Sequence, residues 1–167
     1  LWRSPEVVRK QFADNGWQRV IAFQTSRVIH RVQRDMLLEK AEQYDAQLLI
    51  HPTLGQTRAG DIDGATRVHA YEAVMGEFPF GLAMLALSPL AMRQAGPREA
   101  LWHCLIEQNY GASHFLIGPN DSSPRDRSGN STFYQPYEAH EFVRQYEQEL
   151  TIKVLCLDER VYDTKQQ

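Results

Sequence analysis

Arg19-Val20-Ile21-Ala22-Phe23 is a short, mainly apolar run with the length of one β-strand. Residues 29–44 follow it with the apolar spacing of a helix, and residues 47–50 form a second apolar run of strand length. A strand, a crossover helix and a second strand together make the unit from which parallel sheets are built. The stretch 19–50 therefore predicts one such unit.

Strands and helices go on alternating after that stretch, and one further helix precedes it. Further strands are predicted at residues 81–87, 114–117 and 152–157, and further helices from Ser4-Pro5, at 65–75, from Gly96-Pro97 and from about residue 136. In the helix that Gly96-Pro97 opens, Leu101, Leu105 and Ile106 are predicted to face the core. Continuous apolar strands that alternate with amphipathic helices are typical of a parallel sheet covered on both faces. The sequence predicts an α/β fold, a Rossmann-like doubly wound parallel sheet, in a single domain over residues 1–167.

The composition argues against several classes of partner. The formal net charge is −3 and no dense basic run occurs, so no nucleic-acid partner is expected. No segment approaches about 18 apolar residues in a row, so no membrane span is expected. The histidines lack metal-ligand spacing, and the two separate cysteines predict free thiols in a reducing, cytoplasmic setting. Because the chain begins at Leu1 rather than methionine, we expect it to be part of a longer protein.

Polar residues concentrate in the loops that follow the predicted strands. In an open parallel sheet, ligands bind beyond the carboxyl ends of the strands, near the point where the strand order reverses. Four loops should therefore frame any site, at residues 24–29, 51–63, 88–96 and 118–135. The sequence has neither a Walker phosphate loop nor a Gly-x-Gly-x-x-Gly fingerprint, so nucleotide binding would need another scheme.

Four segments in and beside these loops resemble one family when they are taken together. They are Ala22-Phe23-Gln24-Thr25 with His30-Arg31, His51-Pro52 through Gly55-x-Thr57-x-x-Gly60-Asp61, Pro89-Leu90-Ala91-Met92-Arg93, and Asn109-Tyr110-Gly111-Ala112. In this order they are similar to the ATP sulfurylases, or sulfate adenylyltransferases, over nearly the whole chain. The resemblance implies a domain of the nucleotidyltransferase type.

The resemblance also implies a reaction, in which sulfate attacks the α-phosphorus of Mg-ATP to give adenylyl sulfate and pyrophosphate. No covalent intermediate is expected, and magnesium arrives with the nucleotide rather than at a dedicated protein site. In such chemistry the protein mainly positions two anions and stabilises charge on the transferred group. A homo-oligomer of the full-length protein and a fused adenylyl-sulfate kinase are further expectations from the resemblance.

The family's functional residues are carried over to matching positions of this sequence. The catalytic positions are Arg27, His30 and Gln33. The sulfate-binding positions are Gln24, Arg27 and Ser122. The ATP-binding positions are Thr25, His30, Gln33, Gly55, Gly60, Asp61 and Gly118.

The chain departs from the family pattern where the family carries charge. Ser26 and Pro119 stand at arginine positions, Gln33 stands at a histidine position, and Asp121 replaces a further histidine with an acid. Loss of one transition-state donor typically costs about 10²–10³ in rate. The resemblance therefore implies an activity that is weakened or lost.

Three interpretations follow from these departures. In the first, the domain still turns over, with Arg27, Arg125 or Arg127 in place of the lost arginines. In the second, it is a catalytically silent structural or regulatory module attached to an adenylyl-sulfate kinase. In the third, the specificity has changed to another oxyanion or nucleotide.

Overall fold

A parallel five-stranded sheet lies at the centre of the structure, a computed structural model that describes residues 1–55, 62–124 and 132–157. The strands are β1 (Val20–Thr25), β2 (Gln47–Pro52), β3 (Ala83–Leu85), β4 (His114–Ile117) and β5 (Lys153–Cys156), in the order β3-β2-β1-β4-β5. Each neighbouring pair of strands is parallel. The predicted α/β fold with a Rossmann-like parallel sheet is confirmed.

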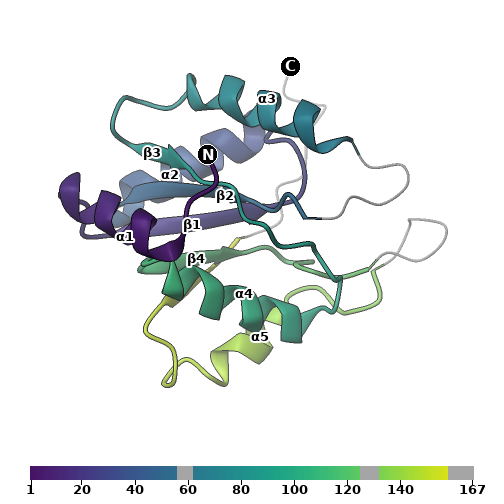
Figure 1. The fold of residues 1–167 in the computed structure, drawn as a ribbon. Helices are drawn as coiled ribbons and strands as arrows, with labels where there is room; N and C mark the ends of the chain where they lie inside the picture. The colour runs from purple at the N-terminus through teal and green to yellow at the C-terminus, as the bar shows by residue number, and fades with distance from the viewer. Residues whose placement is uncertain (56–61, 125–131, 158–167) are drawn as a thin grey trace, which may run out of the picture.

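Helices cover both faces of the sheet (Figure 1). They are α1 (Pro5–Asp14), α2 (Arg31–Tyr44), α3 (Gly64–Met75), α4 (Pro97–Asn109) and α5 (Glu138–Arg144). α2 and α3 pack on one face, and α1, α4 and α5 pack on the other. Within the described ranges, none of the helices is long and apolar enough to span a bilayer.

The core consists of two apolar layers, one on each face of the sheet. Adjacent residues of a strand face opposite ways. Ala22 and Leu49 accordingly pack with α1, α4 and α5, whereas Ile21 and Leu48 pack with α2 and α3. This is why the central strands are continuous apolar runs rather than alternating ones.

The strand order reverses at β1, which pairs with β2 on one side and with β4 on the other. From β1 the chain turns to α2 on one face, and from β4 it runs towards α5 on the opposite face. Loops that diverge in this way leave room for a ligand between them at the carboxyl ends of the two strands. The fold therefore places the most favourable binding position between the loops that follow β1 and β4.

Several elements are shorter than predicted, two of them for reasons that the structure shows. The strand predicted at residues 81–87 is β3, which has three residues; beyond it, the backbone N–H of Leu87 donates to the carbonyl of Leu1 at 3.1 Å. The amino-terminal segment thus pairs at the edge next to β3. The helix predicted from residue 136 begins at Glu138, because Tyr137 before it has a left-handed conformation with φ of 67°.

α4 buries a face that the apolar pattern did not predict. Leu105 is 43% exposed, so the predicted inward position of Leu105 is wrong, although the other two residues of that stripe are partly buried against the core. The core side of α4 carries Glu99, His103 and Glu107, spaced four residues apart. Two of them have hydrogen-bond partners. The Glu99 carboxylate accepts from the backbone N–H groups of Arg93 and Ala95, and His51 Nδ1 lies 2.8 and 2.9 Å from the two carboxylate oxygens of Glu107.

Candidate active site

Two adjoining cavities open at the carboxyl ends of β1 and β4. One has a volume of about 330 Å³ and the other about 520 Å³. Six residues line both of them: Gln24, Thr25, Gln33, Gly118, Pro119 and Asp121. Three of the four loops predicted to frame a site contribute to these walls, those that begin at residues 24, 88 and 118.

The two cavities differ in character, and we name them accordingly. The smaller one, the apolar cavity, has a wall of aliphatic and aromatic side chains: Phe23, Val32, Met36, Leu116 and Leu157. The larger one, the polar cavity, is surrounded by the turns after β1 and β4, with Ser26, Arg27, Asn120, Ser122 and Ser123 among its lining residues. A ligand with an apolar ring at one end and charged oxygens at the other would match this division.

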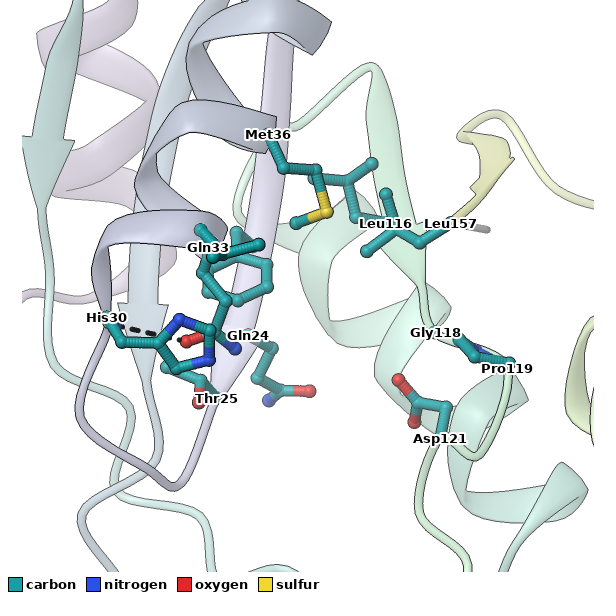
Figure 2. A pocket seen from close by; sticks show the side chains of 12 residues that line it. Gln24, Thr25, His30, Gln33, Met36, Leu116, Gly118, Pro119, Asp121 and Leu157 are labelled. Carbon is teal, nitrogen blue, oxygen red and sulfur yellow. Dashed lines mark hydrogen bonds between the residues drawn. The ribbon is translucent and has the colours of Figure 1, made fainter. Parts of the chain in front are cut away.

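Gln24, the next-to-last residue of β1, lies where the two cavities meet. Its amide points into the space between β1 and the loop after β4, towards the side on which Asp121 lies (Figure 2). Both amide atoms are buried, and neither has a hydrogen-bond partner among the described residues. Because buried polar atoms are nearly always paired in folded proteins, this amide has a free donor and a free acceptor for a bound molecule.

The start of α2 supplies two further lining residues. His30 is the N-cap of the helix, which begins at Arg31 rather than at residue 29 as predicted. The backbone N–H of His30 donates to Gln33 Oε1 at 3.3 Å, so the Gln33 side chain closes the first turn. The amino end of a helix carries partial positive charge and favours anions. His30 and Gln33 thus belong to a helix end that faces the apolar cavity.

The loop after β4 forms the opposite wall. Ser122 has a left-handed backbone with φ of 53°, and its hydroxyl donates to Asp121 Oδ1 at 2.7 Å. The carbonyl of Ser122 accepts from Gly96 N–H at 2.9 Å, which ties the loop to the start of α4. Burial raises the pKa of Asp121, although the bond from Ser122 opposes the shift. The Asp121 side chain faces the Gln24 amide across the cavity (Figure 2).

Known proteins resemble this chain throughout its length. A family model for ATP-sulfurylase matches residues 1–167. The chain belongs to the ATP sulfurylase family. The sulfate adenylyltransferase of Schizosaccharomyces pombe is 48% identical over 159 residues, which are 95% of this chain and 32% of that protein. The Saccharomyces cerevisiae sulfate adenylyltransferase is 44% identical over 155 residues, which are 93% of this chain and 30% of that protein.

The fold alone is shared with a more distant solved structure, a hexameric APS kinase from Thiobacillus denitrificans. The superposition covers 99% of this chain and 29% of the kinase chain, with a TM-score of 0.77 and 24% sequence identity. The chain spans about a third of the length of each of these relatives. ATP sulfurylases are enzymes, so the chain is a member of an enzyme family.

The structure brings together most of the site positions that the ATP sulfurylase resemblance implied. Seven of them line the cavities: Gln24, Thr25, Arg27, His30, Gln33, Gly118 and Ser122. Gly55 does not, and it lies against another loop, where a Cβ would approach the backbone of Leu90 and Ala91 to 2.6 Å. Gly60 and Asp61, and the candidate replacement cations Arg125 and Arg127, lie outside the described residues.

A buried pair next to these cavities was missed by the sequence analysis. Gln24 and His51 are partners in the register of β1 and β2, so both side chains project from the same face of the sheet. His51 and Glu107 are fully buried, and the ring of Tyr110 lies 4.3 Å from that of His51. The spacing of Glu99, His103 and Glu107 on one face of a helix was the available signal, since charged residues are rarely fully buried without partners.

No group of three metal-ligating side chains occurs in the part of the chain that the structure describes.

Positive charge is scarce around the two cavities. Among their described lining residues, Arg27 is the one arginine or lysine, and Asp121 faces the same space. Lining of this kind gives little Coulomb attraction to a bound anion. Apart from Arg27, no arginine or lysine of the described loops lines either cavity.

Replacement of Asp121 by asparagine is expected to stabilise the fold at neutral pH. The pKa of Asp121 is raised by burial, so ionisation costs more in the folded than in the unfolded state, and stability is lost as pH rises through the folded pKa. The variant keeps the acceptor for Ser122 but does not ionise. Its advantage in urea unfolding should be present at neutral pH and disappear as pH falls to about 4. The exposed Asp14→Asn variant should show no comparable gain; a gain for Asp121→Asn that persists undiminished in acid would contradict the assignment.

Proposed function

We propose that this domain binds adenylyl sulfate, and the Mg-ATP and sulfate from which it is made, as the catalytic domain of a sulfate adenylyltransferase with weakened turnover. The unpartnered amide of Gln24 is the observation that carries the proposal. It lies at the junction of an apolar and a polar cavity, and adenylyl sulfate joins an aromatic base to a phosphate-sulfate anhydride. The family assignment supports the same ligand.

The two cavities suggest an orientation for the nucleotide. The apolar cavity would take the adenine ring against Met36, Leu116 and Leu157, and its volume is in the range of small-molecule sites. The polar cavity would then take sulfate and pyrophosphate. In this orientation the Gln24 amide N–H and the Arg27 guanidinium bind the sulfate oxygens. Gln33, in the first turn of α2, lines both cavities and would face the nucleotide phosphates.

The proposed reaction needs no nucleophile from the protein. A sulfate oxygen bonds to the α-phosphorus while the bond from that phosphorus to the pyrophosphate oxygen breaks, and pyrophosphate leaves. Magnesium belongs to the nucleotide substrate and neutralises charge on its phosphates. The protein would hold sulfate in line with the leaving group and stabilise charge on the α-phosphate.

Weakened turnover follows from the lining of the cavities. Pro119 has neither a side-chain charge nor a backbone N–H, and Asp121 adds a carboxylate on the same wall. A transition state with excess negative charge would be stabilised poorly there. The same observation favours a second candidate function, a silent module that binds nucleotide and regulates an attached adenylyl-sulfate kinase in the cytoplasm, within a homo-oligomer.

The Gln24→Leu variant tests the binding step. Calorimetric titration should show affinity for adenylyl sulfate lower by about 10–100-fold, because a hydrogen bond to a charged group contributes about 1.5–3 kcal/mol. Gln24→Glu has nearly the same shape and should bind more weakly still, since it places a negative charge beside the anion. The exposed Gln145→Leu variant is the control. Equal affinities for Gln24→Leu and the unaltered protein would exclude Gln24 from the site.

A further inference from the structure

Arg67, in the first turn of α3, is a buried cation that the proposed reaction does not use. Its side chain is 5% exposed, and its Nη1 donates to the carbonyl oxygens of Ser26 at 2.9 Å and Thr53 at 3.0 Å. Those carbonyls belong to the loops that follow β1 and β2. One guanidinium therefore joins the two loops at the carboxyl ends of neighbouring strands.

Tyr71, one turn further along α3, acts on the next peptide of the same loop. Its hydroxyl donates to the carbonyl of Arg27 at 3.0 Å, and its side chain is fully buried. Burial raises the pKa of Tyr71, while the positive charge of Arg67 opposes that shift. The hydroxyl group thus remains a donor at neutral pH. α3 in this way binds two successive carbonyls, those of Ser26 and Arg27.

The direction of these carbonyls matters because Ser26 and Arg27 line the polar cavity. A carbonyl oxygen carries partial negative charge and would repel an anion bound beside it. Hydrogen bonds from Arg67 and Tyr71 turn both oxygens towards α3. The hydroxyl of Thr25 completes the turn, since it accepts from the N–H of Arg27 at 3.0 Å.

The charge of Arg67 is not neutralised by a carboxylate in the described part of the chain. No ion pair there includes Arg67, and its Nε has no hydrogen-bond partner. A buried charge bound only by neutral carbonyls is costly, and an anion nearby offsets that cost. The loop that lines the polar cavity is therefore backed by a fixed positive charge.

We propose that Arg67, assisted by Tyr71, is the positioning residue of the loop 25–27, which it orients for an oxyanion in the polar cavity. The ligand class is a sulfate or phosphate dianion, or the corresponding part of adenylyl sulfate. Arg67 does not touch the ligand and acts through the peptides of Ser26 and Arg27. The anion part of this inference rests on the proposed function, whereas the ordering of the loop does not.

Hydrogen–deuterium exchange of the ligand-free full-length protein tests the ordering of the loop. Tyr71→Phe removes one hydroxyl and should speed exchange in peptides that cover residues 25–29 by about fivefold, the effect of one net hydrogen bond. Arg67→Met should speed it by about tenfold or more, and Arg67→Lys should give an intermediate value, since it keeps the charge and loses the fork. Arg98→Met, at an exposed position of α4, is the matched control.

Titration with adenylyl sulfate on the same variants tests the link to the anion. Affinity should fall by about tenfold or more in Arg67→Met and recover in part in Arg67→Lys, with melting temperatures measured in parallel. Unchanged exchange at residues 25–29 in both Tyr71→Phe and Arg67→Met would overturn the positioning role, and unchanged affinity in Arg67→Met would overturn its effect on the anion. If the unaltered protein bound no adenylyl sulfate while the exchange differences persisted, the proposed function would fail and the ordering of the loop by Arg67 would stand.

Discussion

A Ser26→Arg/Arg27→Asn/Pro119→Arg variant is expected to form ATP from adenylyl sulfate and pyrophosphate at least about 10²-fold faster than the unaltered protein. Positions 26 and 119 lie on opposite walls of the polar cavity, in the loops after β1 and β4. Arginine at both would place two guanidinium groups around a bound oxyanion, where the described lining has only Arg27. Each restored donor should contribute about 2.7–4 kcal/mol to transition-state stabilisation if it reaches the developing charge.

The assay for this variant couples ATP formation to light emission, with magnesium present throughout. The two single variants Ser26→Arg and Pro119→Arg separate the contributions of the two walls. The control is Arg31→Lys, at an exposed position in α2. It changes an arginine outside the cavities without changing the charge of the protein, so its rate should equal that of the unaltered protein. A triple variant with a correct fold and no gain in rate would show that the missing arginines are not the cause of weak turnover.

The Glu107→Leu variant is expected to lose about 3 kcal/mol of unfolding free energy, because removing one partner of a buried hydrogen-bonded pair leaves the other unsatisfied. The two carboxylate oxygens of Glu107 lie 2.8 and 2.9 Å from His51 Nδ1, and both side chains are fully buried. Leucine would leave that nitrogen without its hydrogen-bond partner. For a domain of this size the melting temperature should fall by roughly 10 °C.

A double variant, His51→Leu/Glu107→Leu, distinguishes loss of the pair from simple loss of packing. Because both polar partners are removed together, no unpaired group remains, and the double variant should be more stable than Glu107→Leu alone. The exposed Glu72→Leu change on α3 should alter the free energy of unfolding by less than about 0.5 kcal/mol. Equal stabilities for Glu107→Leu and Glu72→Leu would contradict the proposed importance of the pair.

The fold could be predicted because the strands are apolar runs of the right length. Residues 20–23 and 47–50 lie in the strands β1 and β2, where burial on both faces demands continuous apolar sequence. The inward face of α4 could not be predicted in the same way. Leu105 fits an apolar stripe, but the His51–Glu107 pair joins residues 56 apart in sequence and fixes the helix with a polar face towards the sheet.

The lining of the cavities was predictable where residues end a strand, as Gln24 and Thr25 do, or directly follow one, as Gly118 does. Their place in the chain puts them at the carboxyl ends of β1 and β4, where the cavities open. The buried hydrogen bonds that hold the loop after β1 in place were not predictable. Arg67 donates to the carbonyl of Ser26, which lies 41 residues earlier in the sequence, and no local sequence pattern predicts such a contact.

The most direct test of weakened sulfate adenylyltransferase activity is the reverse assay on the unaltered full-length protein, with adenylyl sulfate varied at fixed pyrophosphate and magnesium. Slow ATP formation that saturates with adenylyl sulfate is the expected result, since the cavities and the Gln24 amide remain while the lining cations are few. No ATP above the background without protein would contradict residual catalysis and leave the silent, nucleotide-binding module as the function of this domain.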